Sequence, residues 1–289
     1  MKAGSNRHGF TLIEFLVAVG ILAILLAILL PYVWRQRESA RRTECEAHLM
    51  ILGRALAMYA SANGYSLPQT TYDPDHRPRG YSVFTGADEP SPFTRPSLVQ
   101  PNDVTASLWL LVREKYVTDL SVFICPSTDD IPDRLVNAAG SRVVAQFRGN
   151  FRSSLNLSYS YACPFTDAEF AFSTDRLQHD FALLADKNPG FDAENGRVLG
   201  PGPDAPPFEL AKGNSMNHQQ AGQNVLHPDG NVSFEWTPYC GVEHDNIYTA
   251  LAPKPEHEPH PQMNVPGYIG TEYGPAHYDD SYLVPTAGD

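Results

Sequence analysis

Basic residues are scarce in this 289-residue chain. It has 21 lysine and arginine residues against 33 aspartate and glutamate residues, which gives a formal net charge of −12 at pH 7. Nucleic-acid-binding proteins hold the phosphate backbone mainly through basic side chains, so this balance argues against a nucleic-acid partner. The one basic cluster directly follows an apolar run, where it would lie among lipid head groups: Arg35, Arg37, Arg41 and Arg42.

Cysteine is also rare. The four cysteines, Cys45, Cys125, Cys163 and Cys240, are widely spaced and form no C-x-x-C pair, which argues against a structural zinc site. One or two disulfides are expected if the domain lies outside the cytoplasm. The favoured pair is Cys125 with Cys163, because both lie beside predicted sheet elements, but spacing alone leaves the pairing open.

Catalytic motifs are missing as well. The sequence contains no G-x-S-x-G, H-E-x-x-H, P-loop or G-x-G-x-x-G pattern. We therefore expect the protein not to be an enzyme and to need no cofactor.

Only one apolar run, residues 10–34, is long enough to cross a membrane. As an α-helix it would reach about 37 Å, more than the roughly 30 Å of a bilayer's hydrocarbon core. The rest of the chain is polar enough to be water-soluble and long enough for one domain with its own core. The sequence thus predicts a single membrane span followed by a soluble domain.

One carboxylate, Glu14, interrupts the apolar run near its start. A secretory signal peptide would have a shorter apolar region and a small-residue cleavage site, neither of which is found here. A plain membrane anchor fits the length but leaves Glu14 unexplained, because a charge at the centre of a membrane helix costs about 2.5 to 3.5 kcal/mol. Such a residue is expected to have a cationic partner.

The residues around Glu14 resemble the leader of type IV prepilins and type II secretion pseudopilins. A short basic leader ends in Gly9, Phe10 would be the new N-terminus, and Glu14 would be the fifth residue of the mature chain. The resemblance implies that a prepilin peptidase cleaves between Gly9 and Phe10 and methylates the Phe10 amine. It also implies that Glu14 pairs with that amine on a neighbouring subunit, since opposite charges a few ångströms apart attract strongly in an apolar bundle.

The resemblance further implies a location and a set of partners. The protein would be a single-pass inner-membrane protein with its N-terminus in the cytoplasm and its head in the periplasm, and would enter a filament after assembly. The flanking charges do not favour this orientation, because two basic residues precede the span and four arginines follow it. The implied partners are prepilin peptidase, other pilin or pseudopilin subunits, an inner-membrane assembly platform and the lipid bilayer.

The apolar run is predicted to begin one extended helix that reaches about Ala62. Pro31 should bend or locally melt it, because proline lacks a backbone donor and clashes with the preceding turn. Asn63 and Gly64 are typical of a helix end. Apolar residues recur every three or four positions after the span and form a stripe that should pack on a sheet: Cys45, Leu49, Leu52, Leu56 and Tyr59.

Beyond the helix, a Pro- and Gly-rich stretch at 68–102 predicts a long loop, and a shorter helix is predicted near 103–115. Strands are predicted at 157–163, 181–185, 224–227 and 232–236. The sequence Pro-Asp-Gly-Asn at 228–231 joins the last two strands as a hairpin. Helix first and strands later, without alternation, predicts an α+β fold, in which a long pilin-like helix packs on an antiparallel sheet.

Two further stretches resemble an expanded pseudopilin-like family of bacteria. Residues around Cys125 resemble its F-x-C-P-S stretch, and His218 precedes Asp229 and Gly230 as in its His-x(9-10)-Asp-Gly signature. A structural interpretation is favoured, in which Asp229 caps its own turn and Gly230 takes a positive φ. The alternative is an ion site of Asp186 and Asp229 with His218, for which the resemblance to pseudopilins implies calcium.

The predicted organisation is a leader at 1–9, a transmembrane and assembly helix at 10–34, a pilin-like periplasmic head at 35–250, and a Pro-rich tail at 251–289 that is extended or partly disordered. The implied function is that of a pseudopilin or minor pilin-like subunit, assembled by helix packing into a type II secretion or type IV pilus-like filament. The alternative is a membrane-anchored extracytoplasmic enzyme or binding protein whose anchor merely resembles a pilin leader.

Overall fold

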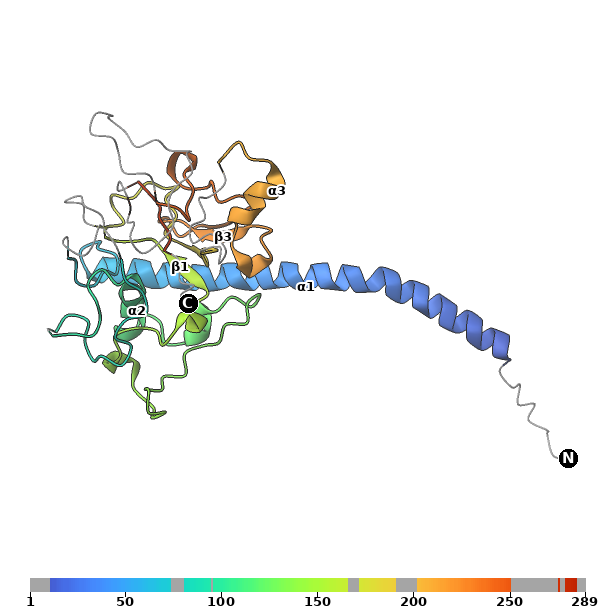
Figure 1. Ribbon diagram of the computed structural model, residues 1–289, viewed down its shortest axis with the longest axis horizontal. Coiled ribbons are helices and arrows are strands. Elements are labelled where there is room, and N and C mark those ends of the chain that lie inside the picture. The colour runs from blue at the N-terminus through green and yellow to red at the C-terminus, as the bar shows by residue number, and fades with distance from the viewer. Residues whose placement is uncertain are drawn as a thin grey trace. The chain divides into compact units, whose positions relative to one another are not determined.

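The computed structural model describes residues 11–73, 81–94, 96–165, 172–190, 202–250, 275 and 279–284. The chain divides into two compact units, Met1–Arg41 and Arg42–Asp289. The long helix α1, Leu12–Ala62, contributes to both units, and the second unit holds the other helices and strands (Figure 1). The second unit is called the head below.

The first unit contains the apolar half of α1. Leu12–Leu30 is long and apolar enough to cross a membrane, and none of these side chains is buried. A helix that is apolar on all sides requires apolar surroundings. The helix continues through Pro31 without interruption, so the local melting expected there does not occur, while a bend at this residue stays a prediction.

The head's part of α1 carries the predicted apolar stripe. The four residues Cys45, Leu49, Leu52 and Leu56 are at most 1% exposed. The helix ends at Ala62, as predicted, and Gly64 follows it with a φ of +62°. A Cβ atom on Gly53 would lie 2.8 Å from a Leu226 methyl group, so this glycine allows the sheet to approach the helix closely.

Four short strands form one antiparallel sheet in the order β1-β2-β3-β4: β1 Tyr159–Tyr161, β2 Leu184–Asp186, β3 Gln223–Leu226 and β4 Val232–Glu235. The register places Tyr159 opposite Asp186, and Leu184 opposite Leu226. Every residue of β1, β2 and β3 is buried, so these strands are covered on both faces. The α+β fold class predicted from the sequence is confirmed.

Helix α2, Val104–Arg113, lies inside the head. Asp103 caps its N-terminus by accepting a hydrogen bond from the Ala106 backbone nitrogen at 2.7 Å. The residues from Val104 to Val112 are all buried, and Trp109 packs edge-on against Phe151. Short helical turns complete the head: η2 Leu120–Phe123, η3 Ala145–Phe147, η4 Ser154–Asn156, α3 Pro207–Leu210, η5 Ala211–Gly213, η6 Met216–His218 and η7 Val242–His244.

The segment 279–284 lies in the core of the head, although the Pro-rich composition of 251–289 predicts an extended tail. Tyr282 and Leu283 are 0% exposed. Leu283 forms an antiparallel bridge with Ala162, and the Tyr282 hydroxyl lies 3.0 Å from that of Tyr81. The head thus includes residues beyond the predicted boundary at 250, while most of the predicted tail lies outside the described residues.

The buried stripe on α1 gives a stability prediction. Leu52→Ala should lower the free energy of unfolding by about 2 to 5 kcal/mol, because it removes a fully buried side chain and leaves a cavity. Met58→Ala on the same helix, at a side chain that is 51% exposed, should change it by less than about 0.5 kcal/mol. Urea unfolding of the full chain in detergent, followed by tryptophan fluorescence, measures both, and equal losses would contradict the packing described.

Candidate functional site

Four metal-ligating side chains meet inside the head: Cys45, Cys125, Asp186 and His218. These residues are called the cluster below. Each is 0% exposed, and one ligand atom from each lies within 4.8 Å of the others. They come from four separate segments, namely α1, the loop after η2, the end of β2, and η6. Folding of the head therefore brings together residues that are far apart in the sequence.

The Asp186 carboxylate is the centre of the cluster. Its Oδ2 accepts a hydrogen bond from the Asn224 backbone nitrogen at 2.7 Å and lies 3.3 Å from His218 Nε2. Its Oδ1 accepts from Cys45 Sγ at 2.9 Å and from Asn217 Nδ2 at 3.0 Å. A buried carboxylate is stable only when its oxygens are paired, so these contacts fix the position and orientation of Asp186.

The turn η6 positions His218. The Ser215 hydroxyl caps this turn by accepting from the Asn217 backbone nitrogen at 3.2 Å, and Asn217 Nδ2 also donates to the Ser158 carbonyl at 2.8 Å. The second contact joins η6 to the residue that precedes β1. With η6 held in this way, His218 Nε2 lies 3.7 Å from Cys125 Sγ.

The cluster alters the protonation of its own members. Burial raises the pKa of Cys45 well above its ordinary value, and a hydrogen bond with Cys125 raises it further. For Cys125, the same hydrogen bond lowers the pKa and burial raises it. A hydrogen bond with His218 lowers it further, and the resulting pKa is about 7. Burial alone would lower the pKa of His218, but hydrogen bonds with Asp186 and Cys125 outweigh it and raise the pKa to about 10. Cys125 is therefore the thiol that ionises more readily.

The cysteine prediction was wrong. All four cysteines are free thiols, so the structure does not contain the expected disulfide between Cys125 and Cys163. The Cys163 thiol contacts the Phe165 carbonyl at 3.9 Å, whereas Cys125 contacts His218. Both cysteines do lie near strands. Nearness to a sheet does not determine where each side chain points, and these two thiols contact different residues.

The signature hairpin lies at the far end of β3 from the cluster. Asp229 Oδ1 accepts from the Asn231 backbone nitrogen at 2.9 Å, and Gly230 has a φ of +84°, as the structural interpretation predicted. Asp229 is in an exposed turn, whereas Asp186 is buried in the cluster. The structure therefore does not bring these two carboxylates together as calcium ligands, although it does join Asp186 with His218.

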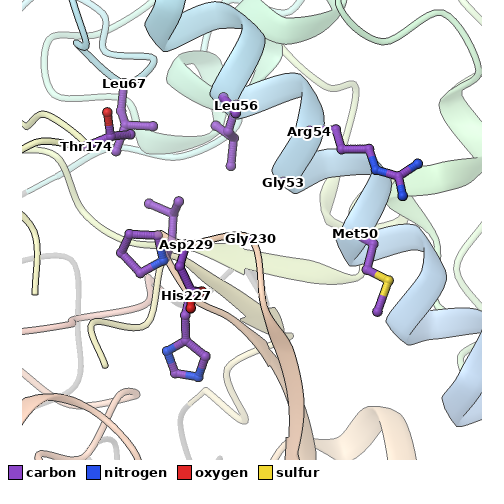
Figure 2. Close-up of a pocket in the computed structure, with 12 residues that line it drawn as sticks. Met50, Gly53, Arg54, Leu56, Leu67, Thr174, His227, Asp229 and Gly230 are labelled. Atoms are coloured by element: carbon purple, nitrogen blue, oxygen red, sulfur yellow. The ribbon is translucent and has the colours of Figure 1, made fainter. Parts of the chain in front are cut away.

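A pocket lies between this hairpin turn and α1 (Figure 2). Leu56 and Arg54 line it from the helix, and His227 lines it from the hairpin. The His227 ring nitrogens lie 3.1 Å from the Phe181 carbonyl and 3.4 Å from the Ser233 hydroxyl. These contacts hold the hairpin to the segment just before β2, so His227 has a structural role here.

The processing residues Gly9 and Phe10 lie outside the described residues. Glu14 is in the first turn of α1, where its Oε2 accepts hydrogen bonds from the backbone nitrogen and the hydroxyl of Thr11, both at 2.8 Å. These contacts hold the carboxylate toward the N-terminal end of the helix.

The hairpin gives a second stability prediction. Gly230→Ala should lower the free energy of unfolding by about 1 kcal/mol, because an L side chain is strained at positive φ. An added Cβ would meet no atom within 4 Å, so the loss comes from the backbone alone. Gly230→Asn should lose less, since asparagine tolerates this region better. Urea unfolding measures the stability of each variant. An alanine variant as stable as the wild type would contradict the positive φ described for Gly230.

A comparison with protein-family models matches residues 4–30 to the Prokaryotic N-terminal methylation motif. Comparisons with curated proteins and with solved structures give no match. The matched segment contains Gly9, Phe10 and Glu14 and overlaps the apolar helix Leu12–Leu30. The motif and the helix together support a type IV pilin-like protein that is processed as a prepilin and anchored in the membrane.

Proposed function

We propose that the protein is a pseudopilin or minor pilin-like structural subunit of a type II secretion or type IV pilus-like filament. The observation that carries the proposal is the methylation motif at residues 4–30, which leads directly into an apolar, uncovered helix with Glu14 in its first turn. In this proposal the protein does mechanical and interfacial work and has no catalytic activity.

The apolar helix supplies the assembly surface. Its side chains are exposed on every side, for example Leu12 at 79% and Ile28 at 70%. Lipid covers such a helix before assembly, and neighbouring helices cover it in a filament. Because lipid tails are as apolar as leucine, burial of apolar surface alone gives little preference for another helix over lipid. A polar contact is therefore needed to favour assembly and to fix its register.

Glu14 provides that contact. An unpaired carboxylate in apolar surroundings is costly, and pairing it with a cation offsets the cost. The contacts with Thr11 hold the carboxylate toward the start of the mature chain. The amine of Phe10, created by cleavage after Gly9, is the cation that a neighbouring subunit would present. Cleavage and assembly are then coupled, because the uncleaved chain has no such amine.

In this proposal the N-terminus lies in the cytoplasm, and several proteins act on the chain or bind it. Prepilin peptidase would cut and methylate at the cytoplasmic face, and the head would lie in the periplasm. Other pilin or pseudopilin subunits would bind along the helix, and an inner-membrane assembly platform would move subunits out of the bilayer.

Glu14→Ala tests the register contact. The variant should insert in the membrane and be cleaved as usual, but its recovery in sheared filaments should fall at least about tenfold, since removing one partner of a buried ion pair costs about 3 to 5 kcal/mol. Glu44→Ala removes an exposed carboxylate from the same helix and should assemble normally. Quantitative immunoblotting of filament and membrane fractions measures both, and normal recovery of the Glu14 variant would refute the pairing.

Gly9→Val tests processing. The variant should keep its first nine residues, because in this proposal the peptidase recognises the glycine before the cut. Gly4→Val, in the same leader but away from the cut, should be cut normally. Mass spectrometry of the N-terminal peptide from native membranes reads the result. Wild-type protein with an intact Met1 and no methylated Phe10 would favour the alternative, a membrane-anchored extracytoplasmic binding protein or enzyme.

A further inference from the structure

We infer that the cluster, Cys45, Cys125, Asp186 and His218, is a structural Zn²⁺ site in the head. The inference is independent of whether the chain assembles into a filament. In the sequence these residues are a core position, an expected disulfide partner and members of a calcium site, and the lack of a C-x-x-C pair argues against zinc. The fold brings them together from separate segments, so that spacing rule does not apply to them.

The donor set selects the metal. Two thiols, an imidazole and a carboxylate offer two sulfur atoms, one nitrogen atom and one oxygen atom. Calcium and magnesium bind mainly oxygen ligands and do not fit a set with two thiolates. Zinc binds cysteine, histidine and aspartate together, usually four of them at the corners of a tetrahedron. The cluster supplies four such ligands.

The distances fit a tetrahedral site. Bonds of about 2.0 Å from zinc to nitrogen or oxygen and about 2.3 Å to sulfur place neighbouring ligand atoms about 3.3 Å apart without sulfur and about 3.5 to 3.8 Å apart with it. His218 Nε2 lies 3.3 Å from Asp186 Oδ2 and 3.7 Å from Cys125 Sγ. Cys45 Sγ now donates to the same carboxylate at 2.9 Å. Zinc would replace that hydrogen bond, and the two thiol protons would leave to solvent.

A second layer of contacts orients the ligands. Asn217 Nδ2 and the Asn224 backbone nitrogen hold the Asp186 carboxylate, and the Tyr159 hydroxyl donates to Cys45 Sγ at 3.4 Å. Metal sites in proteins commonly have such outer partners, and their loss weakens metal binding about 10- to 100-fold. These outer contacts hold both oxygens of the Asp186 carboxylate and the Cys45 sulfur in place, as the second layer of a metal site does.

Burial indicates a structural role for the zinc. All four ligands are 0% exposed, so four protein atoms complete the coordination and leave no open position for water or substrate. The ion would cross-link the head's part of α1 to the loop after η2, to β2 and to η6. Such a cross-link would stabilise a fold whose four strands are only three or four residues long.

The first experiment uses the wild-type full chain, purified in detergent from cells supplied with Zn²⁺. Elemental analysis should find about one zinc ion per chain after removal of loosely bound metal. X-ray absorption at the zinc edge should show two sulfur ligands at about 2.3 Å and two nitrogen or oxygen ligands at about 2.0 to 2.1 Å. Protein that retains no zinc, a shell of oxygen ligands alone, or a disulfide between Cys45 and Cys125 in non-reduced peptides would overturn the inference.

Variants locate the ion. Cys125→Ser should reduce the bound zinc at least tenfold, while Cys163→Ser, which removes a buried thiol outside the cluster, should leave it unchanged. Asn217→Ala should keep the four ligands but weaken zinc affinity about 10- to 100-fold in competition with a chelator. Circular dichroism checks that each variant is folded. Equal zinc content in folded Cys125→Ser and Cys163→Ser would overturn the assignment even if the wild type binds zinc.

Discussion

The head depends on one fully buried carboxylate. Asp186 has 0% exposure, and its two oxygens accept hydrogen bonds from donors on three elements, α1, η6 and β3. A charge in such a position destabilises the fold unless all of these donors are in place together. Burial of the Asp186 carboxylate needs all of its hydrogen-bond donors. Only the native packing of helix, turn and sheet supplies them together, so the carboxylate favours that one arrangement.

The two units differ in what surrounds their side chains. The apolar half of α1 has exposed side chains that need lipid or other helices around them. In the proposed filament, Glu14 would add the polar contact that favours a neighbouring subunit over lipid. The head folds around its own core and holds its segment of α1 through the apolar stripe and the cluster. In the proposed subunit, the head would have to hold its part of α1 firmly, and the apolar stripe and the cluster are the contacts that hold it.

Local patterns were enough to predict much of the fold. The spacing of Leu49, Leu52 and Leu56 gave the buried face of α1, and the turn residues around Gly230 gave the hairpin. The motif around Glu14 could be read directly because its residues are adjacent in sequence, and the family comparison covers the same segment.

The cluster could not be predicted in this way. Its residues come from four segments, so no C-x-x-C spacing marks it, and Cys45 looked like one more apolar position on the helix stripe. The nearest signal was that Cys125 and His218 both lie in stretches resembling one family. Asp229 was grouped with Asp186 because the resemblance to pseudopilins implies calcium and both offer carboxylate oxygens, but the register of β2 with β3 separates them. The burial of Tyr282 was missed because a Pro-rich composition says little about one short segment within it.

Hydrogen exchange of the full chain, read by mass spectrometry, tests the central role of Asp186 most directly. Asp186→Asn should speed exchange in four separate segments at once: around Cys45 in α1, in β2, in η6 and in β3. Asp103→Asn is the matched control, because Asp103 is equally buried but caps α2, and its effect should stay near α2 and the loops that contact it. If Asp186→Asn changes exchange only within β2, the carboxylate does not organise the head and the account is wrong.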